Sequence, residues 1–594
     1  MEQTLHPTWD LDVIFPGGSD SKAFHTYLQS TQEEMKNLFN TVSYFSPKKR
    51  DGDKETLVLL IKQLEATMKK VREAFAFISC LSAQNLKDEK ANLLVSRRHE
   101  IKAEMDTIQT TFEQKLVDIP DIVWDQLVKS EDLVDVAYVL EEFRNHANEQ
   151  LVRDQEVLIN DLAIDGYHAW GQMYDVIIGN MSVDMVEDGE TKSYSIGQAT
   201  NKLTHPNRSY RKQVFQQLDK AWKNNASLFG QTLNHLAGFR LQTYKHRNWN
   251  EVLQEPLALN RMRKETLDAM WTAIKKYKHP FVEYLMNKAK LLGLNKLSIY
   301  DVGAPVNKVV KTSSFEEGAD FIVEHFTQFS PQMADFAKMA FENRWIEAED
   351  RPNKRPGGFC TSFPDSKQTR IFMTYSGTSS NIATLAHELG HAYHQHVMND
   401  VNGLNQRYAM NVAETASTFA EMVVADASVK SARSIAEKKS LLEDKIQRSI
   451  AFFMNIHSRF IFERRFYEER KQGLVPVKRL NDLMIEAQKE AYCDALSEYD
   501  PNFWASKLHF HITRVPFYNF PYTFGYLFSL GIYAKAQENE DSFEDAYISL
   551  LRDTGRMNVE DLAKKHLDTD LTKPEFWEAA IQLCVNDVDE YLSL

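Results

Sequence analysis

The feature that most constrains this chain is a stretch from about residue 54 to residue 116 that runs almost without Gly or Pro. Apolar side chains recur in it every three or four residues with charged side chains between them, which predicts long amphipathic helices. These apolar positions include Leu57, Leu60, Ile61, Leu64, Met68, Val71, Phe75 and Ile78. A second such stretch covers residues 132–162, and we expect antiparallel helix pairs in both. With only 22 Gly and 17 Pro in 594 residues, the whole chain is expected to be mostly α.

The length of the chain predicts more than one packed region, because 594 residues exceed what a single hydrophobic core usually holds. Residues 178–198 alternate polar and apolar side chains around an Asp-Gly-Glu turn, which is typical of a β-hairpin. We therefore expect an N-terminal helical lobe over residues 1–200 that contains this hairpin, and a second helical lobe over residues 201–594.

One region rich in Gly and Pro interrupts the helical pattern between residues 352 and 377. Within it, residues 369–375 predict a short strand just before a helix. The edge of such a strand could pair with an extended peptide, although an ordinary small sheet explains the pattern equally well. Gly377 follows the strand, where we expect a flexible or tight loop close to bound substrate.

The charge balance and the cysteines exclude several classes of protein. The 84 acidic residues outnumber the 70 basic ones, and the net charge of −14 disfavours non-specific binding to nucleic acid. The four cysteines do not make a disulfide framework, since no two have a Cys-x-x-Cys spacing. The N-terminus shows no signal peptide, and no apolar run predicts a membrane span. We expect a cytoplasmic protein that has no obligate protein partner and that binds neither nucleic acid nor membranes.

The segment HELGH at residues 387–391 is an H-E-x-x-H pattern and carries the chemistry of the chain. His387 and His391, four residues apart, lie on one face of an α-helix, so both imidazoles can reach one metal ion. Glu388 is turned about 100° around the helix from the first His, which suits a general base rather than a third ligand. The flanking sequence predicts a helix over about residues 379–398, with an apolar face opposite the two His.

A catalytic zinc site needs a third protein ligand and an open fourth position. The longer pattern H-E-x-x-H-x-x-G-x-x-H does not supply it, because His394 and Val397 stand where that pattern requires Gly and His. Glu414 is the candidate, on a predicted second helix, and a plain surface carboxylate is its alternative interpretation. Glu421 shares a helical face with Glu414, and we expect it to accept the outer N–H of a ligating His. The sequence thus predicts one Zn²⁺ per chain, although Co²⁺ or Mn²⁺ could occupy the same ligands.

The segment HELGHAYH followed by ETASTFAE resembles the signature of the thimet oligopeptidase-like zinc metallopeptidases, H-E-x-G-H-x-x-H followed by E-x-x-S-x-x-x-E. The opening HPTWDLDVIFPGGSD and the late segment SKLHFHITRVPFYNFPYTFGYLFS resemble the oligoendopeptidase F branch of that family. The resemblance implies that His387, His391 and Glu414 bind zinc, with Glu388 as the general base. It also implies a helical clam whose two lobes enclose a deep channel, which restricts substrates to short peptides. We expect a small β-sheet near the metal-binding helix.

The late segment over residues 509–528 is rich in aromatic residues, a pattern that on its own is typical of packing. The resemblance implies that a His and a Tyr of this segment stabilise the oxyanion and hold the substrate backbone. The family usually has His-Phe-Tyr where this chain has His-Phe-His at residues 509–511, so either His could fill the role. We map the catalytic roles to Tyr522, for the oxyanion, and His509, and the substrate-binding roles to Tyr518, Tyr526, His511 and Gly377.

Two residues near these motifs are expected to have structural roles. Cys360 lacks a supporting Cys/His arrangement and is interpreted as an inert thiol. His394 lies one turn beyond His391 and is interpreted as a satisfied polar residue, because a fourth protein ligand would close the open metal position.

The leading hypothesis is therefore a zinc-dependent endopeptidase that hydrolyses internal bonds of short oligopeptides. A metal-dependent carboxypeptidase of related helical fold is the alternative, and it would trim single residues from C-termini. A non-catalytic peptide-binding protein is a remote alternative, because the expected ligands and the base are all present.

Overall fold

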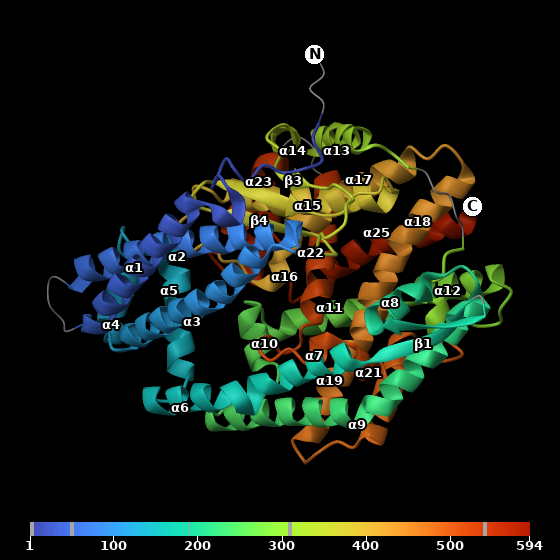
Figure 1. Cartoon of the computed structure of the whole chain (residues 1–594), viewed down its shortest axis with the longest axis horizontal. Coiled ribbons are helices and arrows are strands. Elements are labelled where there is room, and N and C mark those ends of the chain that lie inside the picture. Colours follow the sequence, from blue (N-terminus) through green and yellow to red (C-terminus); the bar gives the residue numbers. More distant parts are fainter. Residues whose placement is uncertain (1–4, 48–52, 188, 307–311, 539–542) are drawn as a thin grey trace. The chain divides into compact units, whose positions relative to one another are not determined.

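The computed structural model describes residues 5–47, 53–187, 189–306, 312–538 and 543–594. Helices make up 70% of the structure, which confirms the mostly α expectation. The stretch without Gly or Pro forms α2 (Asp53–Gln84) and α3 (Glu89–Val117), and both pack against α1 (Lys22–Tyr44), as the blue helices of Figure 1 show. Asp88 begins α3 by accepting the Ala91 N–H, so the helix pair is separated by a short capped turn.

By its packing the chain divides into two compact units, each assembled from three segments. Unit 1 comprises residues 1–150, 310–428 and 532–569, and unit 2 comprises residues 151–309, 429–531 and 570–594. The expected lobes, 1–200 and 201–594, are each continuous in sequence, so they differ from this interleaved division. Helical periodicity shows which face of a helix is buried but not which distant segment covers it.

In unit 1, helices come both before and after the three strands of a small sheet along the chain. Its helices after α3 are α4 (Asp121–Val128), α5 (Ala137–Glu149), α13 (Phe315–Phe329), α14 (Pro331–Glu342), α15 (Ser379–Val397), α16 (Met410–Ala413), α17 (Thr415–Lys430), α23 (Phe543–Asp553) and α24 (Val559–Leu567), with the short η1 (Gly18–Asp20) and η2 (Val134–Val136). The last two residues of α17 already belong to unit 2.

Unit 2 contains the longest helix, α9 (Arg208–His246), and a second group of helices near the C-terminus. The others are α6 (Arg153–Ala163), α7 (Ala169–Asn180), α8 (Ile196–Asn201), α10 (Gln254–Leu259), α11 (Lys264–Lys276), α12 (His279–Leu291), α18 (Ile435–Ile450), α19 (Ile456–Arg470), α20 (Val477–Ala491), α21 (Phe503–Ser506), α22 (Phe520–Glu538) and α25 (Pro574–Ser593), with the short η3 (Ile164–His168), η4 (Lys202–Thr204), η5 (Ile299–Asp301), η6 (Ala451–Asn455) and η7 (Leu508–Phe510). α22 runs from unit 2 into unit 1 at residue 532.

The predicted hairpin is present in unit 2 as β1 (Ser182–Glu187) and β2 (Glu190–Ser195). The two strands are antiparallel, with Ser182 opposite Ser195 and Glu187 opposite Glu190. Asp188, the first residue of the expected turn, lies outside the described residues. Val183 and Met185 are buried while their neighbours are exposed, so the alternation seen in the sequence corresponds to one covered face.

A three-stranded sheet in unit 1 lies against α15. Its strand order is β3 (Ile346–Glu347), β5 (Gln368–Phe372) and β4 (Phe359–Phe363), with β3 parallel and β4 antiparallel to β5. This confirms a small sheet near the metal-binding helix. Of the two interpretations of residues 369–375, the ordinary small sheet holds, because β5 is the central strand and both of its edges are paired.

None of the helices among the described residues has the length together with the apolar character that a membrane crossing requires.

Candidate functional site

The H-E-x-x-H segment lies in the middle of α15, whose start is set by its own sequence. Thr378 is the N-cap, and it forms a capping box with Asn381: the Thr378 hydroxyl accepts the Asn381 N–H and the Asn381 side chain accepts the Thr378 N–H. The helix thus begins at Ser379, as predicted. Leu385, Ala386 and Leu389 are buried on the back of α15, which leaves the His face free for a ligand.

His387, His391 and Glu414 come together in unit 1 as a potential metal site, with one ligand atom from each within 4.8 Å of the others. Glu414 Oε2 lies 3.3 Å from His387 Nε2 and 3.5 Å from His391 Nε2. Glu414 occupies the junction between α16 and α17, rather than the body of a helix, so its carboxylate can turn towards α15. His387 and His391 of α15 are therefore brought close to the carboxylate at the α16–α17 junction.

The electrostatics of this cluster suit a metal cation. Burial opposes a charge on His387, but hydrogen bonds to Glu414 and Glu421 outweigh it and raise the pKa of His387 to about 10. The site thus stabilises positive charge at this position. Burial lowers the pKa of His391 to about 4, which keeps its imidazole neutral and able to donate a lone pair. Burial of Glu414 is likewise outweighed by its His387 hydrogen bond, and its pKa falls to about 2. When a metal ion binds, His387 would give up one proton, and two imidazole nitrogens with one carboxylate would then fit Zn²⁺ chemistry.

A second layer of contacts holds these ligands in place. Glu421 Oε2 lies 3.1 Å from His387 Nδ1, at the position expected for it. His391 is hydrogen-bonded to the backbone of Ala413, and the Ser417 hydroxyl donates to Glu414 Oε2 at 2.9 Å. The Ala413 contact was not foreseen, because a backbone group has no signal in the sequence. Ser417 stands at the Ser of the E-x-x-S pattern, which could have identified it.

Glu388 is 7% exposed and is not among the grouped ligands. Burial, with the nearby charges of Glu414 and Glu421, raises its pKa to about 7. Within the described part of the chain its Oε2 has no hydrogen-bond partner. A Cβ at Gly358 would lie 3.3 Å from its Oε1, so the glycine leaves room beside the carboxylate. An unpartnered buried carboxylate with a pKa near neutrality can both accept and release a proton.

The surroundings of His394 and Cys360 are consistent with structural roles, although His394 Nδ1 has no hydrogen-bond partner among the described residues. His394 is fully buried, stacks on Tyr408 at 4.3 Å and contacts Thr554 Oγ1 through Nε2 at 2.9 Å. Burial raises the pKa of the Cys360 thiol on β4 well above its usual range, which is consistent with an inert group.

Three of the aromatic candidates form a cluster in unit 2. His509 lies on η7, Tyr518 in the following loop and Tyr522 on α22. The ring of His509 is 5.5 Å from that of Tyr518 and 6.0 Å from that of Tyr522. All three are half-buried. Burial lowers the pKa of His509 to about 4, helped by the charges of Arg459 and Lys507, so its imidazole is neutral.

Buried charged residues anchor the loop between η7 and α22 from both sides. Glu463, on α19, accepts the Phe517 N–H at 3.2 Å and the Asn519 amide at 2.6 Å. Arg240, on α9, donates to the carbonyls of Ile512 and Thr513 at 3.3 and 3.2 Å. Neither residue was a candidate from the sequence, because nothing in a helical pattern shows that a charge is buried against a distant loop.

The remaining candidates are enclosed. His511 is 1% exposed and stacks on Tyr174 at 4.2 Å, and Tyr526 is 4% exposed with its hydroxyl 3.0 Å from that of Ser449. This burial argues against direct contact between either residue and a peptide. Gly377 has a φ of +83°, and a Cβ there would come within 2.7 Å of the Ser313 carbonyl oxygen, so a glycine is required by the backbone.

Comparison with known families matches most of the chain to two sequence families. The family described as peptidase family M3 matches residues 202–583, and the one described as oligopeptidase F matches residues 115–182. An oligoendopeptidase F homolog of Lactococcus lactis subsp. lactis is 22% identical, with 99% of this chain and 97% of the relative covered. Oligopeptidase PepF of Bacillus subtilis is 22% identical, covering 99% of this chain and 87% of the relative.

A solved structure has the same fold over the full length. A crystal structure assigned as a peptidase from Chlamydophila abortus superposes with a TM-score of 0.82, at 18% identity, over 100% of this chain and 99% of the other. The helical architecture is therefore shared at a level of sequence identity where most side chains differ.

Proposed function

The chain belongs to peptidase family M3 and is a metallopeptidase, and on that premise we propose that it is a zinc-dependent endopeptidase acting on short oligopeptides. The observation that carries this proposal is the cluster of His387, His391 and Glu414, whose ligand atoms lie within 4.8 Å of one another. The same cluster holds Glu421 against the outer nitrogen of His387. We assign the enzyme to the cytoplasm and one Zn²⁺ to each chain.

His387, His391 and Glu414 would hold the zinc and leave one position open. When bound, the ion would supply a Lewis acid that lowers the pKa of water and polarises a carbonyl. Glu421 accepts the Nδ1 proton of His387 and thereby directs the Nε2 lone pair towards the ligand set. The Ser417 hydroxyl fixes the carboxylate of Glu414 in the same way.

Glu388 acts as the general base. Its carboxylate takes a proton from the attacking water and passes it to the leaving amine, and its pKa of about 7 suits both transfers near neutral pH. Gln has the same shape as Glu and resembles its neutral, protonated form, but it cannot act as a base. We expect Glu388→Gln to bind zinc normally and to lose about 10²–10⁴-fold in kcat.

The aromatic cluster of unit 2 contributes hydrogen bonds to the substrate. We assign Tyr522 to the oxyanion, where a phenol O–H stabilises developing negative charge. His509 and Tyr518 hold the substrate backbone, and the low pKa of His509 keeps it a neutral donor or acceptor. Gly377 shapes the loop after β5. The burial of Tyr526 and His511 makes packing their role in this scheme.

The proposal can be tested by incubating the enzyme with short peptides of graded length and one folded protein, and then identifying the products. Mass spectrometry would compare the untreated, chelated and zinc-restored enzyme. Internal cleavage of short peptides alone, lost with the metal and regained with zinc, is the expected result. Ladders of single residues would instead indicate a carboxypeptidase, and an intact mixture with zinc-loaded enzyme would contradict peptidase activity on these substrates.

Glu388→Gln and Glu414→Gln make a matched pair of variants for the same assay. The first should retain zinc without turnover, whereas the second should lose zinc as well, because it removes a ligand. Near-normal turnover by the Glu388→Gln protein would overturn the assignment of the base.

A further inference from the structure

Two cations in unit 2 share one aromatic ring. The guanidinium carbon of Arg459, on α19, lies 5.4 Å from the centroid of Phe503, and Lys507 Nζ lies 4.7 Å from the same centroid. Both side chains are half-buried. Cation–π contact stabilises each charge in part, but it leaves the N–H donors of both groups available.

Neither cation forms an ion pair with a carboxylate within the part of the chain that the structure describes. Arg459 donates from Nε to Asn455 Oδ1 at 2.9 Å, which is a neutral acceptor. Asp500 is the carboxylate whose charge acts on Lys507, and it instead accepts the Asn502 N–H at 2.9 Å. Burial lowers the pKa of Arg459 to about 10, and burial together with the charge of Arg459 lowers that of Lys507 to about 8. Each cation therefore lacks an ion-paired carboxylate within the described residues, while the charge of Asp500 still acts on Lys507.

Two other buried cations of unit 2 differ from this pair. Lys288 Nζ lies 2.9 Å from Glu443, and Arg211 Nη2 lies 2.9 Å from Asp301. A buried charge is normally compensated in this way, because removal from water is costly without a partner.

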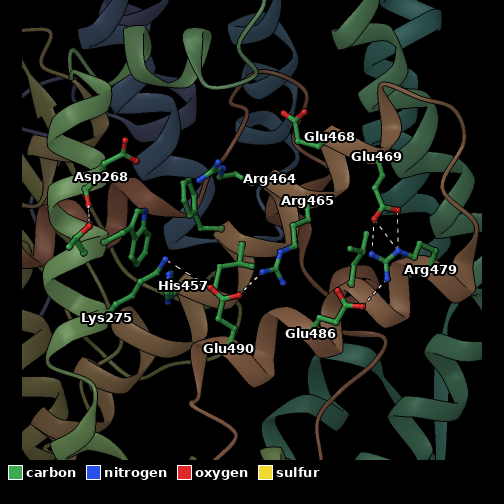
Figure 2. A pocket seen from close by; sticks show the side chains of 15 residues that line it. Asp268, Lys275, His457, Arg464, Arg465, Glu468, Glu469, Arg479, Glu486 and Glu490 are labelled. Carbon is green, nitrogen blue, oxygen red and sulfur yellow. Dashed lines mark hydrogen bonds and ion pairs between the residues drawn. The ribbon is translucent and has the colours of Figure 1, made fainter.

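The hollow in Figure 2 shows the same compensation. It lies between α11, α19 and α20 and has a volume of about 600 Å³. Arg465 pairs with Glu490, and Arg479 pairs with both Glu469 and Glu486. The charges at this hollow are largely satisfied by one another, which leaves little demand for an ionic ligand. Arg459 and Lys507 have no such internal partners.

Arg459 and Lys507 lie beside the aromatic cluster to which we assign substrate binding. Lys507 precedes His509 by two residues, and the charges of both cations act on His509. Arg459 also acts on Tyr522. A cavity of about 330 Å³ is lined by Lys507 and Phe503. Its other lining residues include Asn455, Tyr492, Asp219 and Asp500. Space for a ligand thus adjoins Lys507, the second member of the pair.

We infer that Arg459 and Lys507 form a subsite for a carboxylate of the peptide substrate, either its C-terminus or an acidic side chain. This inference rests on the proposed function, because it takes His509 and Tyr522 as substrate-binding groups. The planar guanidinium of Arg459 matches a carboxylate with two parallel hydrogen bonds, and the ammonium of Lys507 adds a second charge. Such a subsite would favour short peptides, whose C-terminus lies near the scissile bond.

Three forms of one peptide without other acidic residues would test the subsite. The first carries a free C-terminal carboxylate, the second a C-terminal amide, and the third an amide together with one Glu in place of a Gln. We expect the wild-type enzyme to show kcat/KM about tenfold or more higher for the acid than for the amide, the range of a charge-assisted hydrogen bond. If the Glu restores the rate of the amide, the carboxylate can also come from a side chain.

Variants at the pair should remove this preference. Arg459→Gln and Lys507→Gln should cleave the acid and the amide at similar rates, whereas Lys507→Arg should keep the preference because it keeps the charge. Arg464→Gln is the matched control, since Arg464 lies on the same helix and over a Phe ring, that of Phe460, at 5.8 Å. It should behave as wild type.

Equal cleavage of acid and amide by the wild-type enzyme would overturn the subsite and leave the peptidase assignment intact. An equal loss on all three peptides in the variants would also overturn it, because it would indicate a structural role. Calorimetry with the Glu388→Gln protein would measure the affinity for each peptide without turnover. Tighter binding of the acid there, in the absence of any wild-type hydrolysis, would support the subsite while contradicting the proposed function.

Discussion

Glu421 Oε2 lies 3.1 Å from His387 Nδ1, on the opposite side of the imidazole from the Glu414 carboxylate that approaches Nε2 at 3.3 Å. Burial opposes a charge on His387, but both of its ring nitrogens face a carboxylate and its pKa is raised to about 10. When a metal ion replaces the proton on Nε2, the hydrogen bond to Glu421 would keep the proton on Nδ1. The tautomer needed for metal binding is therefore set within unit 1.

Glu421→Gln should weaken metal binding without removing a ligand. The amide would accept the Nδ1 proton less strongly and could also present an N–H to the imidazole, so we expect about a 10–100-fold loss in zinc affinity. Competition with a fluorescent chelator would measure it. Glu324→Gln, at an exposed position on α13, is the control. Unchanged zinc affinity in Glu421→Gln would show that Glu421 does not support the site.

Gly390 permits the contact between the two helices that build the site. A Cβ at residue 390 would lie 2.4 Å from the carbonyl oxygen of Ala416 and 2.6 Å from the Cα of Ser417, both of them backbone atoms. Gly390→Ala must therefore push α17 away from α15 and carry Glu414 with it. We expect the free energy of unfolding to fall by about 1–3 kcal/mol and zinc binding to weaken.

Gly197→Ala is the matched control for Gly390→Ala, because nothing lies within 4 Å of a Cβ at that helical position. It should leave stability nearly unchanged. Thermal unfolding and zinc titration of both variants would separate the effect of the contact from that of losing a glycine. A Gly390→Ala protein with normal stability and zinc affinity would contradict the close approach.

The approach of His387, His391 and Glu414 to one another could be predicted, because part of their geometry is local. Two His four residues apart share a helix face wherever that helix packs, and Glu414 and Glu421 follow after a connection that contains the short helix α16. Gly390 was part of the same segment, yet its contact with Ala416 depends on how α15 and α17 approach, which no periodicity reveals. The same reason hid Arg459 and Glu463, which reach the aromatic segment only through tertiary packing.

The fold was predictable to the level of its helices and hairpin for a similar reason. The burial of every third or fourth residue in α2 is visible in its sequence, and so is the alternation in β1. The pairing of β5 with a strand on each side is not, because a short apolar run looks the same at an edge and in the centre of a sheet. The two units are each assembled from three distant segments, so their boundaries have no local signal.

Glu463 should prove a positioning residue for the loop that carries Tyr518. Glu463→Met keeps the volume but removes both acceptors, which leaves the Phe517 N–H and the Asn519 amide unsatisfied inside unit 2. We expect the free energy of unfolding to fall by about 1–3 kcal/mol for each unsatisfied group. If Tyr518 and Tyr522 act on the transition state, kcat should fall more than KM rises.

Unfolding and steady-state kinetics of Glu463→Met would be compared with those of two other proteins. Glu463→Gln keeps one acceptor and should recover part of the loss. Glu468→Gln, on the same helix, removes only an exposed contact with Lys471 and should match wild type. A Glu463→Met protein that is destabilised but has unchanged kcat would limit Glu463 to a structural role.

Asp553 should make the stability of unit 1 depend on acid pH. It ends α23 and contacts Lys565 at 2.6 Å and His566 at 2.8 Å, both on α24. Burial opposes its ionisation, but hydrogen bonds from His566, Lys565 and Arg556 outweigh burial and hold the pKa of Asp553 well below its usual range. Because the folded-state pKa lies below the unfolded value of about 3.9, this stabilisation is complete above that pH and is lost as the pH falls further.

Asp553→Asn should therefore unfold at a lower temperature than wild type at pH 7, with a difference of about 1–3 kcal/mol. The difference should shrink below about pH 4, as the wild-type carboxylate takes up a proton. Thermal unfolding across this pH range would measure it, with the exposed Asp545→Asn on the same helix as the control. A difference that stayed constant from pH 7 to pH 3 would mean that the charge of Asp553 does not join α23 to α24.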